Sequence, residues 1–231
     1  DKYITQDYDE VQIDESRSDY VLREEQLKAV QSTLYYYNSG KEPREFLWNA
    51  KPRFGKTLTA YDFIRRINAK NVLIVTNRPA IANSWFDDFQ KFIAWREVGM
   101  KFVSEVDSLK DKAMTRQDFI DYATFTEHEN PSQISFISLQ DLKGAKFAGG
   151  IHEKLEWVGQ LDWDVLIIDE AHEGIDTIKT DVAFDKIKRD FTLHLSGTPF
   201  KALASNKFSE EQIFNWSYVD EQEAKTNWDY T

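Results

Sequence analysis

Apolar residues along the chain fall into two patterns, and each pattern predicts one kind of element. Short continuous apolar runs, typical of parallel strands covered on both faces, occur at 46–48, 71–75, 101–103, 134–138, 165–168 and 191–195. Between several of these runs, apolar residues recur every three or four positions, as they do on one face of a helix. This helical spacing occurs at 24–37, 58–67 and 80–94. The sequence therefore predicts strands that alternate with helices.

This alternation predicts an α/β fold, in which a mostly parallel sheet carries helices on both faces. Right-handed crossovers bring the carboxyl ends of parallel strands to one edge of the sheet, and we expect the chemistry at that edge. The first helix is predicted to stop at Asn38-Ser39-Gly40. The charged stretch 105–131 is predicted to form a helix and loop at the surface.

The strength of these patterns divides the chain into three segments. Residues 1–19 are polar and acidic, and we expect them to form a lead-in or linker. Residues 20–206 are expected to form the α/β domain. The pattern weakens after Lys201, so residues 207–231 are expected to begin a following domain or a linker.

Composition narrows the class of protein without revealing its chemistry. The chain has 231 residues, of which 41% are hydrophobic, and this suits one large domain, or one and a half small ones, with a buried core. No apolar run approaches the roughly 20 residues that span a bilayer, and no signal peptide pattern begins the chain, so we expect a cytoplasmic protein with no membrane partner. Cysteine is absent, which excludes disulfides and thiolate metal sites. Because the first residue is not Met, we expect a longer protein.

The net charge of −11 disfavours a nucleic-acid partner, for which basic faces are expected. Part of this acidity lies within residues 1–19. Binding depends on the charge of one face, which cannot be summed from composition. The global charge is therefore weak evidence against such a partner.

A candidate phosphate-binding loop lies between the strand at 46–48 and the helix at 58–67. It contains Arg53, Phe54, Gly55, Lys56 and Thr57, although Ala50 stands where the usual pattern has Gly. Backbone N–H groups of the loop and the amino end of the helix can surround a phosphate. The Lys56 ammonium can bridge the β- and γ-phosphates, and the Thr57 hydroxyl can bind Mg²⁺. The alternative is a chance Gly-Lys-Thr at a helix start.

Two carboxylates, Asp169 and Glu170, emerge at the end of the most hydrophobic predicted strand, and His172 follows them. In a parallel sheet this strand end lies beside the phosphate loop. Asp169 can hold Mg²⁺, Glu170 can orient and deprotonate a water, and His172 can sense the γ-phosphate. The alternatives are an acidic helix start and an ordinary surface histidine, but the combination with Gly55-Lys56-Thr57 disfavours both.

At this point the order of segments over roughly residues 20–200 resembles a known family. It is similar to the first RecA-like P-loop domain of superfamily 2 helicases and translocases of the DEAH type. Residues 50–57 resemble motif I, residues 169–172 resemble motif II, and Ser196-Gly197-Thr198-Pro199 resembles motif III. The resemblance implies ATP hydrolysis with Mg²⁺, with catalytic roles for Lys56, Asp169, Glu170 and His172. It also implies that Ser196, Gly197 and Thr198 couple hydrolysis to movement along a nucleic acid, which is the track of the motor.

Weaker motifs extend the resemblance. Leu22-Arg23-Glu24-Glu25-Gln26 resembles the Q motif, in which the Gln26 amide would read adenine, although a solvated helix residue is the alternative. Positions similar to motifs Ia and Ib imply contacts with nucleic-acid phosphates by Thr76, Asn77, Arg78 and Ser138. The Gly-Thr-Pro form of motif III is most similar to the duplex-DNA motors of type I and type III restriction enzymes. The implied track is double-stranded DNA, and a nuclease or methyltransferase is an implied partner.

Motors of this family carry a second RecA-like domain, whose arginine is worth about 10³–10⁵ in rate in phosphoryl-transfer enzymes. We expect that domain elsewhere in a longer chain, so residues 1–231 alone should hydrolyse ATP weakly. Two other functions stay open. One is a nucleotide-gated scaffold that binds nucleic acid or protein with little turnover, which the intact Glu170 disfavours. The other is an RNA helicase, which Gly197 and Pro199 disfavour.

Overall fold

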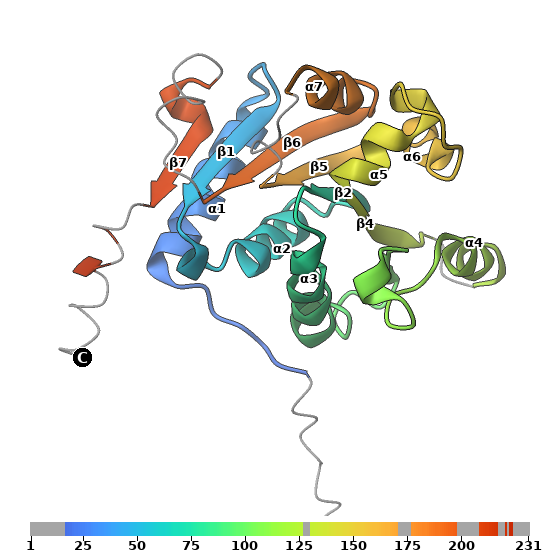
Figure 1. Ribbon diagram of the computed structural model, residues 1–231. Helices are drawn as coiled ribbons and strands as arrows, with labels where there is room; N and C mark the ends of the chain where they lie inside the picture. Colours follow the sequence, from blue (N-terminus) through green and yellow to red (C-terminus); the bar gives the residue numbers. More distant parts are fainter. Residues whose placement is uncertain are drawn as a thin grey trace, which may run out of the picture.

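One parallel sheet of seven strands organises the fold (Figure 1), in the order β3-β4-β2-β5-β6-β1-β7. The computed structural model describes residues 17–126, 130–170, 177–197, 208–216, 220 and 222–223. Every strand pair is parallel. The strands are β1 (Glu45–Ala50), β2 (Asn71–Thr76), β3 (Met100–Val103), β4 (Ser132–Ser138), β5 (Trp163–Asp169), β6 (Arg189–Ser196) and β7 (Ile213–Trp216).

Helices cover both faces of the sheet, which confirms the predicted α/β architecture. One face carries α1 (Glu24–Ser39), α2 (Lys56–Arg66) and α3 (Ala82–Asp88). The other face carries α5 (Leu139–Gly144), α6 (Glu156–Gln160) and α7 (Thr177–Asp185). Between β3 and β4, α4 (Arg116–Phe125) lies at the edge of the sheet, where the sequence predicts a charged surface insertion.

The side chains of the central strand β5 divide between the two larger cores with a period of two. Along β5, Val165 and Ile167 pack under the α1, α2 and α3 helices, whereas Leu166 and Ile168 pack under α5, α6 and α7. All four are buried. A strand buried on both faces needs apolar residues at every position, and this is why the central strands read as unbroken apolar runs in the sequence.

The helix boundaries follow local signals. The first helix ends at Ser39 because Gly40 adopts a left-handed conformation (φ 69°) and donates its N–H to the Tyr37 carbonyl. The predicted helix at 80–94 is α3 continued by a π-helix over Phe89–Ile93. Short 3₁₀ turns complete the described elements at Pro52–Phe54, Pro79–Ile81, Asp107–Leu109, Lys146–Ala148 and Glu210–Gln212.

The last strand differs from the expectation for residues 207–231. Residues Ile213–Trp216 pair with β1 and extend the same sheet, and Trp216 packs in its larger core. A four-residue run gives too weak a pattern to read as a strand, so the sequence suggested a following domain or linker there. The sheet therefore extends beyond the boundary predicted at residue 206.

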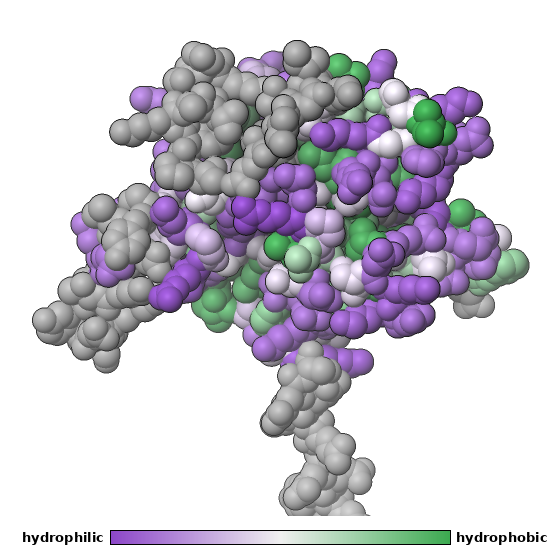
Figure 2. All heavy atoms as spheres, viewed as in Figure 1, coloured by the Kyte–Doolittle hydropathy of each residue, from purple (hydrophilic) through white to green (hydrophobic). Residues whose placement is uncertain are grey.

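The described residues before α1 also pack on the domain. The Ser18 N–H donates to the Lys91 carbonyl, and the Tyr20 hydroxyl donates to Asp62 of α2 at 2.8 Å. The exposed hydrophobic side chains of the described residues, such as Val21, Phe125 and Ile151, lie on separate elements. Figure 2 accordingly shows hydrophobic residues scattered among hydrophilic ones on the described part of the visible face. Among the described residues, no helix is long and apolar enough to cross a membrane.

Candidate nucleotide-binding site

The predicted site residues form a row along the carboxyl edge of the sheet. Strand register places Ser138 beside Thr76, and Thr76 beside Asp169. Asp169 lies beside Leu195, and the next residue, Ser196, pairs with Asn49. Segments far apart in the sequence are therefore neighbours at one edge, where open parallel sheets bind their ligands.

The phosphate loop connects β1 to α2 at this edge. It begins with a 3₁₀ turn over Pro52–Phe54, and Gly55 follows in a left-handed conformation (φ 78°). Lys56 and Thr57 open α2, where N–H groups have no intrahelical carbonyl to bond. Such a helix start attracts anions. The side chain of Arg53 is exposed, whereas that of Phe54 is buried in the core, so Phe54 contributes only backbone groups to the loop.

Two side chains at the start of α1 hydrogen-bond to the backbone carbonyls of this loop. The Gln26 amide Nε2 donates to the Phe54 carbonyl at 3.0 Å, and its Oε1 accepts from the N–H of Arg23 at 2.9 Å. The Arg23 Nη2 donates to the carbonyls of Phe54 and Arg53, at 2.7 and 2.9 Å. Gln26 is buried, and its amide is engaged by the loop. Sequence reasoning missed the part of Arg23, although that residue lies within the motif that suggested Gln26.

An ion pair crosses the site between the loop and the end of β5. The Lys56 Nζ lies 3.1 Å from Oε1 of Glu170 and donates to the Ala50 carbonyl at 3.2 Å. Both charged side chains are only 12–13% exposed. Glu170 has a left-handed backbone (φ 51°), which is uncommon for a non-glycine residue, and its N–H is bonded to the Leu195 carbonyl. Strained residues of this kind cluster at functional sites.

The backbone of Gly197 approaches this pair so closely that a side chain at position 197 would collide with it. A Cβ atom at position 197 would lie 2.9 Å from Oε1 of Glu170 and 3.3 Å from Nζ of Lys56. The described edge thus combines a helix start, a lysine, a carboxylate and the close approach of a glycine backbone. These residues fit the phosphate groups of a nucleotide.

Asp169 is buried beside this pair and is held by an indole. The Trp85 Nε1 donates to Oδ2 of Asp169 at 3.0 Å. Burial raises the pKa of the Asp169 carboxyl to about 6, although the Trp85 hydrogen bond and the Lys56 charge oppose that rise. Trp85 lies within the helix predicted at 80–94, where its helical spacing indicates a core residue. No local pattern could reveal its bond to a residue 84 positions away.

Asp169 and Thr57 form the candidate magnesium site. Thr57 is half-buried in the first turn of α2, and Asp169 ends β5 in the adjacent part of the edge. Magnesium is commonly bound by one or two protein oxygens together with substrate phosphates, so this pair of ligands suits it. The described residues contain no cluster of three or more His, Asp or Glu that could hold a metal alone.

The four predicted nucleic-acid contacts differ in exposure. Asn77 and Arg78 are exposed. Thr76 is fully buried, and its Oγ1 accepts from the N–H of Arg78 at 3.0 Å, so it supports the loop instead of facing a ligand. Ser138 is also buried, and its Oγ accepts from the N–H of Asp141 as the cap of α5. Both residues end strands, and each hydroxyl accepts a hydrogen bond from a backbone N–H in the segment that follows its strand.

Two predicted residues, His172 and Thr198, lie outside the described part of the chain. Ser196 ends β6 and is buried, and Gly197 follows it beside Lys56 and Glu170. Of the two predicted coupling residues that the structure describes, Gly197 lies against the ion pair.

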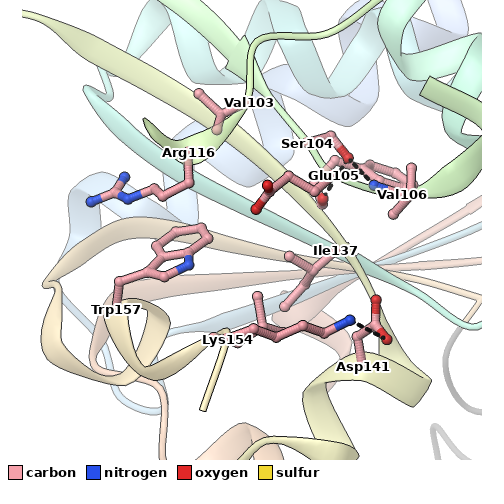
Figure 3. A pocket seen from close by; sticks show the side chains of 11 residues that line it. Val103, Ser104, Glu105, Val106, Arg116, Ile137, Asp141, Lys154 and Trp157 are labelled. Carbon is pink, nitrogen blue, oxygen red and sulfur yellow. Dashed lines mark hydrogen bonds and ion pairs between the residues drawn. The ribbon is translucent and has the colours of Figure 1, made fainter. Parts of the chain in front are cut away.

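A separate pocket lies between the ends of β3 and β4 (Figure 3). The Arg116 guanidinium lies over the Trp157 ring at 4.4 Å, and Lys154 bonds to Asp141 at 3.2 Å. The charged lining residues are two acids, Glu105 and Asp141, and two bases. The cavity is about 40 Å³, which holds a few water molecules at roughly 10–15 Å³ each. It is thus too small and too balanced in charge to be the nucleotide site.

Comparison with known proteins shows which family and which folds this chain resembles. A family model described as "Type III restriction enzyme, res subunit" matches residues 19–201. A protein of Mycoplasma pneumoniae, described as the C-terminus of a proposed type II restriction enzyme and methyltransferase, is 27% identical over 248 aligned residues. That match covers 90% of this chain and 32% of the relative, so the chain spans about a third of the relative's length.

Solved structures share the fold at low sequence identity. The type ISP restriction-modification enzyme LlaGI, in complex with a DNA substrate mimic, matches with a TM-score of 0.62 and 16% identity, over 90% of this chain and 21% of that one. The Sulfolobus solfataricus SWI2/SNF2 ATPase core with double-stranded DNA gives a TM-score of 0.55 and 16% identity, over 82% and 34%. The UvsW helicase of bacteriophage T4 gives 0.54 and 16%, over 87% and 63%. These matches confirm the RecA-like fold.

Proposed function

Because the chain belongs to the family of type III restriction enzyme res subunits, we propose that it is the ATP-binding domain of a nucleic-acid-dependent motor. The Lys56–Glu170 pair beside Gly197 carries this proposal. It joins a phosphate-loop lysine to a carboxylate that can activate water, at the edge where the phosphate loop, Asp169 and the end of β6 meet. A domain that only bound nucleotide would not need this carboxylate.

Each residue has a role that follows from its place. The N–H groups of Gly55, Lys56 and Thr57 face the phosphates from the helix start, and the Lys56 ammonium contacts the β- and γ-phosphates. Thr57 and Asp169 would hold Mg²⁺, which supplies neutralising charge to the phosphate oxygens when bound. Glu170 orients the attacking water and accepts its proton. Arg23 and Gln26 support the loop, while the adenine contact of Gln26 and the γ-phosphate role of His172 stay predictions.

The proposed track is double-stranded DNA. Asn77 and Arg78 are exposed on the loop after β2, adjacent to the end of β5, and they are the residues we propose for strand contact. The solved relatives named for DNA complexes support this choice of nucleic acid, and so does the Gly197 form of motif III. Contacts of this kind would be to the backbone, so binding should weaken steeply with salt. Gly197, with Ser196 and Thr198, is proposed to couple this contact to the nucleotide.

The proposed motor also needs parts outside this chain. A second RecA-like domain would supply an arginine worth about 10³–10⁵ in rate, and without it residues 1–231 should turn over ATP slowly. The Mycoplasma relative is described as both a restriction enzyme and a methyltransferase, which supports a nuclease or methyltransferase as a neighbour of the motor. A cytoplasmic location is proposed for the same assembly.

The test is ATP hydrolysis by a chain that extends through the next domain, with double-stranded DNA, single-stranded DNA or RNA added in turn. We expect duplex DNA to stimulate hydrolysis and Glu170→Gln to abolish it. Stimulation by RNA alone would make the protein an RNA helicase. ATP binding without hydrolysis, in the presence of every nucleic acid, would instead support a nucleotide-gated scaffold.

A further inference from the structure

Trp85 links two elements at the nucleotide edge, which is the carboxyl edge of the sheet where the phosphate loop, Asp169 and Glu170 lie. It lies on α3 and is fully buried, and its Nε1 donates to Oδ2 of Asp169 at 3.0 Å. Its backbone carbonyl accepts a 2.6 Å hydrogen bond from the Tyr61 hydroxyl, and the two rings pack edge to face with centroids 5.3 Å apart. Tyr61 belongs to α2, the helix that begins with Lys56. Trp85 therefore joins the phosphate-loop helix to the end of β5.

The hydrogen bond restricts the carboxylate of Asp169. A free carboxylate can rotate about its last side-chain bond and present either oxygen. With Oδ2 committed to the indole, Oδ1 is the oxygen left for another partner. Asp169 is only 6% exposed, so water cannot readily replace the indole as a donor. Partners that orient a metal ligand in this way typically change metal affinity or activity by about 10–100-fold.

The choice of tryptophan is not explained by packing alone. A phenylalanine would fill much of the same apolar space but has no N–H to donate. Two other buried indoles in the described residues donate to uncharged groups: Trp48 to the Thr33 hydroxyl at 2.7 Å, and Trp163 to the Val158 carbonyl at 3.0 Å. Of these three buried indoles, Trp85 is the one that donates to a carboxylate.

We propose that Trp85 is a positioning residue for magnesium, and that its indole N–H holds the Asp169 carboxylate with Oδ1 turned toward the cation. This inference rests on the proposed function, since it takes Asp169 as a magnesium ligand. It adds a residue from α3, the helix that follows the proposed strand-contact loop at Asn77 and Arg78. The hydrogen bond from Trp85 thereby connects the proposed magnesium ligand Asp169 to that helix.

The test compares Trp85→Phe with Trp163→Phe, which removes an equally buried indole N–H at the opposite end of β5. Mn²⁺ serves as the probe, and its affinity for the chain with saturating ADP is measured by electron paramagnetic resonance. We expect Trp85→Phe to weaken Mn²⁺ binding about 10-fold. ADP affinity without metal should stay within about twofold of the parent, because the phosphate loop keeps its contacts. Trp163→Phe should change neither quantity.

Two results would overturn the inference. One is parent-like Mn²⁺ affinity in Trp85→Phe. The other is equal weakening in Trp163→Phe, which would indicate that loss of any buried indole disturbs the site. If Trp85→Phe does not unfold cooperatively, benzothienylalanine at position 85 replaces the N–H by sulfur and retains the ring shape. The same affinity loss is expected for it, and parent-like affinity would again reject the inference.

The variant Asp169→Asn separates this inference from the proposed function. If it leaves Mn²⁺ affinity unchanged, Asp169 is not a metal ligand and the proposed site itself fails. If Asp169→Asn abolishes Mn²⁺ binding while Trp85→Phe matches the parent, the site stands and only the positioning role of Trp85 is rejected.

Discussion

The two ends of strand β5 use similar residues for different purposes. At the amino end, the indole of Trp163 donates to a backbone carbonyl. The Oδ2 of Asp164, beside it, accepts from the backbone N–H groups of Lys70 and Asn71, at 2.7 and 2.9 Å. Both of these side chains bond to main-chain groups.

At the carboxyl end the polar side chains bond to one another. The indole of Trp85 meets the Asp169 carboxylate, and the Lys56 ammonium meets Glu170. Burial raises the pKa of Asp169 to about 6, and Glu170 has a left-handed backbone. These features cost free energy, whereas those at the amino end contribute it. One end of the strand thus serves stability, and the other holds charged groups at the site of the proposed chemistry.

The largest expected effect at the carboxyl end comes from Glu170→Gln. The amide keeps the shape of the side chain but cannot accept a proton from water, so ATP hydrolysis should fall about 10²–10⁴-fold. Steady-state hydrolysis of the DNA-stimulated longer chain measures this, with ATP binding as the control. Hydrolysis at the parent rate would remove Glu170 from the chemistry.

At the amino end, Asp164→Ala is expected to lower stability and to leave nucleotide binding unchanged. Two backbone N–H groups would lose their acceptor, so the free energy of unfolding should drop by about 1–3 kcal/mol. Urea unfolding measures the loss, and nucleotide affinity of the folded variant should not change. A stable variant with impaired nucleotide binding would contradict the division between the two ends.

A pH-dependent gain in stability is expected for Asp169→Asn. Folding raises the pKa of Asp169, so the charged form is disfavoured in the folded state, and the parent loses stability as pH rises through about 4–6. The amide avoids this and can still accept from Trp85. At pH 7.5 the variant should therefore be more stable by on the order of 1–3 kcal/mol. Urea unfolding at several pH values tests this, since the gain should vanish near pH 3, where Asp169 is protonated in both states.

The smallest effect is expected for Asp162→Asn, which removes an exposed pair with Lys188 near the amino end. These charges are 3.7 Å apart, and both side chains are more than half exposed. The free energy of unfolding should stay within about 0.5 kcal/mol of the parent, because exposed pairs contribute little. A larger loss of unfolding free energy would mean that surface charge, and not hydrogen bonding to backbone groups, stabilises this end.

The fold and much of the candidate site could be predicted from the sequence because both depend on local patterns. Strand β5 is an unbroken apolar run that ends in two carboxylates, and Gly55-Lys56-Thr57 opens a helix directly after a strand. Parallel strands then bring these segments to one edge without any further information. The pairing of Lys56 with Glu170 agrees with that reasoning.

Other features depend on which residues meet across the fold, and local sequence patterns do not reveal those contacts. The bond between Trp85 and Asp169, and the burial of Thr76, follow from tertiary packing. Strand β7 is too short for its period to be read, and its membership in the sheet depends on pairing with β1. The engagement of the Gln26 amide by the phosphate loop likewise requires the position of α1 against β1 and α2.

The contacts that close the nucleotide edge join residues far apart along the chain: 84 positions separate Trp85 from Asp169, and 114 separate Lys56 from Glu170. Contacts of such long range form late in folding, after the loops between them have closed. During synthesis, a ribosome-bound chain that stops short of β6 lacks the Leu195 carbonyl to which the Glu170 N–H bonds. Capture of nucleotide by this edge would therefore require that β6 has already joined the sheet.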